Sequence, residues 1–178
     1  MYKISIFLIL ILTASFSSYS QENEFIKDYI ERLDNSRNYL IIVAETMPED
    51  KYGFKASPES LSFAENLMHI GFAMDWHSQS LLGGRESRDW NTDTEFKVTN
   101  KSKKEMISKI NQTFDETIKL INQFDVSKLN DKMDYFELKR SKRQILLLLT
   151  DHITHHRGQM LVYMRLNGLV PPRYVLYQ

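Results

Sequence analysis

The sequence predicts an all-α protein, a four-helix bundle with one long crossover connection. Apolar residues recur at helical spacing in four segments, proline and glycine are rare within them, and polar linkers lie between them. With 178 residues, of which 42% are hydrophobic, the chain is long enough to bury one core of ordinary size. We find no internal repeat and no second domain in the sequence.

The first two helices have well-marked ends. A stripe of apolar residues predicts the first helix over residues 24–47, and Pro48 ends it because proline lacks the backbone N–H that a helix needs. The second helix is predicted over residues 63–82. Ser62 and Glu65 have the spacing of a capping box at its start, and two consecutive glycines follow its end.

The second half of the chain supplies two more helices. Residues 85–100 form the longest polar connection, which predicts the crossover of the bundle. A further capping box begins a helix over residues 102–124. Residues 125–140 are polar and irregular, with a short extended piece at 134–138. The last helix is predicted over residues 141–167, and a glycine follows it.

The first twenty residues have the layout of a cleavable signal peptide. Lys3 precedes an apolar run over residues 4–16, which is shorter than the roughly 20 residues of a bilayer span, and small residues follow at Ser18 and Ser20. The alternative is an uncleaved N-terminal anchor. We therefore expect an exported protein, periplasmic or extracellular, whose mature part (residues 21–178) is a single domain without a stable membrane span.

Composition excludes several other classes of protein. The chain has no cysteine, so it can be neither a lipoprotein nor a disulfide-stabilised scaffold. Basic and acidic residues balance at 23 each. The short basic segment at residues 101–104 is followed directly by Glu105, which indicates a solvated helix start. We expect no nucleic-acid binding.

The histidines are distributed as a metal site requires. All five lie in residues 69–77 and 152–156. His152 and His156 are one helical turn apart on one face, so they can bind one metal ion if a third ligand comes from another element. His69, at an inward position of the second helix, can be that ligand. The alternative is an ordinary pair with one histidine hydrogen-bonded in the core and the other at the surface.

Six further residues are candidates for the wall of this site or for contacts with its ligands. They are Phe72, Trp76, Glu65, His155, Arg157 and Gln159. Phe72 and Trp76 share the face of His69 and are expected to line a pocket or the core. Glu65 is the only carboxylate at a useful spacing, although its capping role competes. His155 is expected at the surface or beside the ligands.

Three positions have more than one interpretation. Arg157 is expected to form a salt bridge with Asp151 or Glu65, with binding of a substrate anion as the alternative. Gln159 either orients a bound water or forms a hydrogen bond within the bundle. His77 is expected at the rim or surface and is the best substitute ligand.

The residues around the last two histidines resemble the DinB/YfiT-like family of metalloproteins, which is unrelated to the DNA polymerase that shares the DinB name. The resemblance rests on His152-x-x-x-His156-Arg157-Gly158-Gln159, continuing through residues 160–168. Segments 47–54, 57–59 and 62–65 also match, so the likeness covers nearly all of the chain after its first twenty-odd residues. It implies a four-helix bundle with a divalent ion on three histidines, here His69, His152 and His156, and allows a homodimer.

These observations favour a metal-dependent enzyme acting on an unknown small-molecule substrate. Three neutral imidazoles leave a coordination position open, and all-nitrogen ligands suit zinc or nickel. The activity would be that of a hydrolase or a thiol-dependent transferase, since some relatives use thiols such as bacillithiol and mycothiol. Export argues against these cytosolic thiols. The alternative is a non-catalytic metal-binding or interaction protein in which the metal staples two helices.

Overall fold

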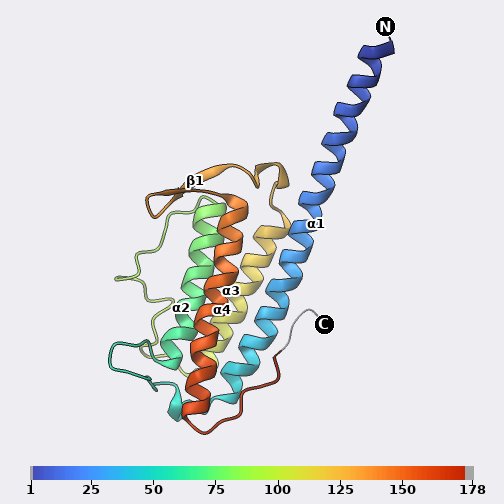
Figure 1. The fold of residues 1–178 in the computed structure, drawn as a ribbon. Coiled ribbons are helices and arrows are strands. Elements are labelled where there is room, and N and C mark those ends of the chain that lie inside the picture. The colour runs from blue at the N-terminus through green and yellow to red at the C-terminus, as the bar shows by residue number, and fades with distance from the viewer. Residues whose placement is uncertain (1, 175–178) are drawn as a thin grey trace.

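A computed structural model describes residues 2–174, with side chains for residues 21–174, and it confirms the predicted bundle. Four long helices pack around one core (Figure 1). Their bounds are α1 Tyr2–Thr46, α2 Phe63–Asp75, α3 Lys103–Asn122 and α4 Lys142–Leu166. α2 packs against both α3 and α4, and α1 packs against α3 and α4.

Helix α1 begins much earlier than the predicted start at residue 24. Residues 2–46 contain neither proline nor glycine, so nothing interrupts the helix across the apolar N-terminal run. The early part of α1 projects beyond the bundle (Figure 1). Ile26 is the first of the buried side chains that the structure describes in α1. Among the described residues, no helix is both long and apolar enough to cross a lipid bilayer.

The crossover lies where the sequence predicts it. α1 and α4 run in one direction and α2 and α3 run in the other (Figure 1). Because α2 and α3 are parallel, residues 83–102 must return along the length of the bundle before α3 begins. On this return the side chain of Phe96 becomes fully buried and contacts Phe72 of α2, so the crossover is part of the core.

The second helix changes its geometry near its end. The predicted span of residues 63–82 is helical throughout, but Trp76–Leu82 form a π-helix, η2, directly after α2. A π-helix bonds residue i to i+5, so side-chain directions depart from α-helical spacing within this segment, although the N–H of Trp76 at its start still bonds the Phe72 carbonyl as in an α-helix. Gly84, with φ +76°, follows the segment in a left-handed conformation that favours glycine.

A small hairpin lies over one end of the bundle. Strands β1 (Lys132–Tyr135) and β2 (Leu138–Ser141) pair antiparallel. The extended piece predicted at residues 134–138 is therefore interrupted by a turn at Phe136 and Glu137. The hairpin sits beside the end of η2 and the start of α4 (Figure 1). Two short 3₁₀ turns, η1 (Glu49–Lys51) and η3 (Val126–Lys128), complete the elements.

Capping boxes begin three of the helices. Ser62 Oγ accepts the Glu65 N–H, and the Glu65 carboxylate accepts the Ser62 N–H at 2.7 Å, as the sequence predicts. The predicted box at the start of α3 is also formed. A third box, between Ser141 and Gln144, begins α4 and escaped the sequence analysis. These caps fix where α2 and α4 start, and therefore which residues of each face the other.

Candidate metal centre

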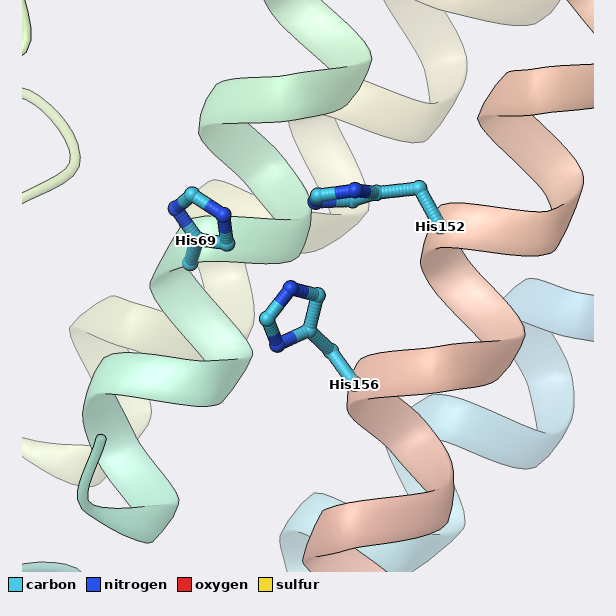
Figure 2. A group of neighbouring side chains, drawn as sticks. All are labelled: His69, His152 and His156. Atoms are coloured by element: carbon cyan, nitrogen blue, oxygen red, sulfur yellow. The ribbon is translucent and has the colours of Figure 1, made fainter. Parts of the chain in front are cut away.

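Three histidines from two helices converge in the bundle. α2 carries His69, and α4 carries His152 and His156; together they are called the histidine triad below. One ring nitrogen from each lies within 4.8 Å of the others. The ring centroids are 4.5 to 5.0 Å apart, and Figure 2 shows the three imidazoles turned toward a common point. The spacing matches three ligands that surround one ion, since zinc–nitrogen bonds are about 2.0–2.1 Å long.

The hydrogen bonding of the triad supports this interpretation. His69 Nδ1 and His152 Nε2 are buried and have no hydrogen-bond partner in the described part of the chain, and no other buried side-chain nitrogen or oxygen there is in that state. Buried polar atoms are nearly always hydrogen-bonded in native proteins. Two such atoms in neighbouring rings are therefore costly unless the cluster binds something, and the donor set fits a divalent ion.

Asn66 fixes the remaining histidine. Its side-chain amide is fully buried and donates to the carbonyls of Leu61 at 3.2 Å and Ser62 at 2.9 Å. The amide oxygen therefore faces His156 and accepts its Nδ1–H at 2.8 Å. A proton on Nδ1 leaves the lone pair on Nε2, so Asn66 selects the tautomer of His156 that can bind a metal through Nε2.

Burial keeps the triad neutral. It is the main cause that lowers the pKa of His152 to about 4 and that of His156 to about 3, and the neighbouring imidazoles lower both further. The pKa of His69 is also lowered, by burial and then by the positive charge of Lys97. Because only neutral imidazoles bind metals, all three rings are in the ligand form at neutral pH.

The aromatic wall of the site differs from the one predicted. Trp90, from the crossover, packs its ring 5.2 Å from that of His69 in a T-shaped contact and 4.7 Å from Phe72. Phe72 contacts Trp90, and its place in the wall of the site stays a prediction. The ring of Trp76 contacts Tyr135 of the hairpin at 5.5 Å, so among the described residues it is Trp90 rather than Trp76 that lies against His69.

His77 is buried, contrary to the expected rim or surface position. Its side chain is 3% exposed. Nδ1–H donates to the Ala73 carbonyl at 2.7 Å, which leaves Nε2 to accept the Tyr135 hydroxyl at 3.1 Å. Both ring nitrogens are satisfied, so His77 joins the hairpin to the second helix and is no substitute ligand. Tyr135, from a region without clear periodicity, escaped the sequence analysis.

A family model matches residues 17–177 of the chain, and its description is the DinB family. The chain belongs to the DinB family. It is 25% identical over 155 residues to the uncharacterized protein YjoA of Bacillus subtilis, covering 83% of this chain and 92% of that protein. The crystal structure of YjoA, described as DinB-like, aligns with a TM-score of 0.65 and covers 85% of this chain and 97% of its own.

Two more solved structures share the DinB fold. A DinB-like protein from Bacillus cereus aligns with a TM-score of 0.63 at 20% identity, over 83% of this chain and 93% of its own. A conserved protein from Enterococcus faecalis aligns with a TM-score of 0.65 at 18% identity, over 79% of this chain and 95% of its own. At these identities the likeness concerns the fold alone.

Three predicted neighbours of the histidine triad make contacts with other residues of the chain. Glu65 caps α2 and pairs with Lys55 at 3.2 Å, so its carboxylate is already bound. His155 is exposed, as expected, and its Nε2 accepts the Gln159 amide at 2.9 Å. Gln159 therefore forms a hydrogen bond on the surface of α4, and the interpretation that it orients a water has no contact in its favour.

Arg157 packs against α1 and does not form the predicted salt bridge. Its side chain is buried against α1, where Nη1 donates to Ser36 Oγ at 2.9 Å and the guanidinium lies 5.2 Å from the Tyr39 ring. In residues 21–174 it has no carboxylate partner, so the predicted pairing with Asp151 or Glu65 is wrong. The reason is helical geometry, since one step of 100° from His156 turns the side chain away from α2.

Asn66 and Trp90 are the contacts of the triad that sequence analysis missed. Asn66 could have been found, because it lies three residues before His69 on the same side of α2 and is a polar residue among apolar ones. Trp90 lies in the crossover, whose residues follow no helical spacing that would indicate their neighbours.

Proposed function

We propose that this DinB-family protein binds one divalent metal ion through His69, His152 and His156 and is a metal-dependent enzyme. One observation carries the proposal. Imidazole nitrogens from two helices converge within 4.8 Å while two nitrogens of the cluster are buried without partners. Without a ligand this arrangement lowers the stability of the fold, because each unpaired buried polar atom costs about 1–3 kcal/mol. A bound ion would remove that cost.

The chemistry of the donors indicates the metal and its role. Three neutral nitrogen ligands favour zinc or nickel over magnesium or calcium, which prefer oxygen. Such an ion supplies Lewis acidity and a coordination position open to an exchangeable ligand. Asn66 fixes the ring of His156, and the ring of Trp90, which is packed on Phe72, covers His69 on one side.

Two reaction classes fit this arrangement, hydrolysis and transfer to a thiol. Hydrolysis needs a general base for water, and Glu65, the candidate from the sequence, is already bound to Ser62 and Lys55. A thiol substrate brings its own nucleophile and needs no such base. The side-chain contacts therefore favour thiol-dependent transfer, whereas the export proposed below favours water as the nucleophile, because the low-molecular-weight thiols are cytosolic.

The rival function is a structural metal that joins α2 to α4. A structural site is closed by a fourth protein ligand, whereas a catalytic site keeps a position for small ligands. The experiment is to load the protein with cobalt and record its visible spectrum while adding azide or a small thiol. We expect about one ion per chain and a spectrum that changes with either ligand. An unchanged spectrum between pH 6 and 9 would favour the structural role.

We also propose that residues 1–20 are a signal peptide removed on export. The support is the short apolar run and the small residues at Ser18 and Ser20. The mass of the intact protein from its native host should correspond to a chain beginning within a few residues of Gln21. A full-length mass in the membrane fraction would indicate an anchor.

A further inference from the structure

The crossover brings one lysine next to the metal centre. Lys97 Nζ lies 3.7 Å from the centroid of the Trp90 ring, and the Trp90 ring lies 5.2 Å from that of His69. Lys97 is half-buried, so its ammonium is partly removed from water. Trp90 is therefore a common neighbour of the ammonium and of His69, and a cation over the face of a tryptophan ring is held there by electrostatic attraction.

Lys97 differs from the other cations of the crossover because its ammonium has no carboxylate or carbonyl partner in the described part of the chain. Arg85 and Arg88 both bind the buried carboxylate of Asp75. Lys101 donates to two backbone carbonyls of its own loop at 2.7 and 2.9 Å. The Lys97 ammonium, by contrast, has neither an ion pair nor a hydrogen bond within residues 21–174. All its donors remain free for a ligand.

The charge of the site is also uncompensated. The triad and Asn66 are neutral, and so are the rings of Phe72 and Trp90, so a divalent ion there would keep its full charge. Glu65, one turn before His69, already pairs with Lys55. Lys97 adds a further positive charge over the Trp90 ring, which contacts His69. Positive charges concentrated beside a half-buried site attract anions.

We infer that Lys97 binds an anionic group of the substrate, such as a carboxylate or phosphate, while another atom of the same molecule occupies the open position on the metal. The inference rests on the proposed function, because it needs an ion with an open position. It names the substrate class as small molecules with a negative charge a few bonds from the metal-binding atom. Trp90 holds Lys97 and provides an apolar surface between the two ends of such a molecule.

The test compares two thiols of equal length on the cobalt-loaded protein. 3-Mercaptopropionate carries a carboxylate where 3-mercaptopropan-1-ol carries a hydroxyl, and the cobalt spectrum reports the binding of each. We expect the wild type to bind the carboxylate about two- to fivefold more tightly, the range for a partly exposed ion pair. The preference should disappear in Lys97→Gln and return in Lys97→Arg. It should also weaken as salt is added.

Controls separate this effect from others. Lys104→Gln removes the same charge from an exposed site at the start of α3 and should keep the preference. Cobalt content and circular dichroism establish that each variant is folded and loaded. If both thiols bind but Lys97→Gln retains the preference, or the wild type has none, the inference is wrong while the open metal site stands. If azide and both thiols leave the wild-type spectrum unchanged, the proposed function fails and the inference fails with it.

Discussion

Replacing Asn66 tests whether the residues around the triad determine its affinity for metal. In the wild type the Asn66 amide oxygen accepts the His156 Nδ1–H at 2.8 Å. The Asn66→Leu variant removes this acceptor. The imidazole can then rotate or take the other tautomer, which places the proton on the nitrogen that should bind the ion. Loss of such a contact to a metal ligand typically weakens binding 10- to 100-fold, which corresponds to about 1.4–2.7 kcal/mol.

The same change has a separate effect on the metal-free fold. Asn66 also donates to the carbonyls of Leu61 and Ser62, so the variant leaves buried acceptors with fewer partners. We expect the free energy of unfolding of the metal-free protein to fall by about 1–3 kcal/mol. Urea unfolding measures this loss, and competition for zinc with a chromophoric chelator measures the affinity of the folded protein.

Two further variants make the result decisive. Ser78→Ala removes another buried hydrogen-bonding side chain, which bonds Met74 and Thr117, and should lower stability without changing zinc affinity. Asn66→Asp keeps an acceptor for His156 and should lose less affinity than Asn66→Leu. The proposed role of Asn66 would be refuted by an Asn66→Leu dissociation constant within twofold of wild type.

Three other predictions concern the site and its support. Alanine at any member of the triad should remove most of the bound metal, whereas His155→Ala should retain it and His77→Ala should lose stability but keep its metal; elemental analysis of each variant decides this. Burial lowers the pKa of the two α4 ligands to about 4 and about 3, so on acidification the unfolded chain takes up protons first, at about pH 6.5. The urea midpoint of the metal-free protein should therefore fall steadily from pH 7 to pH 5, and a midpoint constant over that range would contradict a neutral cluster. Gly71→Ala would place a methyl group 2.7 Å from a side-chain carbon of α3 and should cost about 1–3 kcal/mol, whereas Gly158→Ala, with open space around it, should stabilise α4 by about 0.5–1 kcal/mol; thermal unfolding compares the two.

Local rules explain how much of the bundle could be predicted. Helical periodicity and capping residues act within a few positions, so the starts at Ser62 and Ser102 and the end of α4 before Gly168 follow from sequence. The triad follows as well, because the inward positions of two amphipathic helices must face each other. The early start of α1 was not predicted, because the run over residues 4–16 was set apart from the fold as a signal.

The errors arise where side-chain direction depends on tertiary structure. Trp76 and His77 were placed by their angle to His69, but both contact Tyr135 of the hairpin, whose position depends on the tertiary fold. The partner of Arg157 was chosen by charge, although the side chain lies against Tyr39 of α1. Trp90 reaches His69 through the path of a long loop, which no periodic pattern describes.

The origin of the triad in two distant parts of the chain has a consequence for the order of folding. His152 and His156 are within one turn of α4 and come together as soon as that helix forms, whereas His69 is 83 residues away from His152. Closing so long a loop is slow compared with helix formation, so a complete site exists only after α2 has docked on α4. We therefore expect an ion that needs all three ligands to bind late in folding, after this docking. Such an ion should slow unfolding more than it speeds folding, and so lengthen the lifetime of the folded chain.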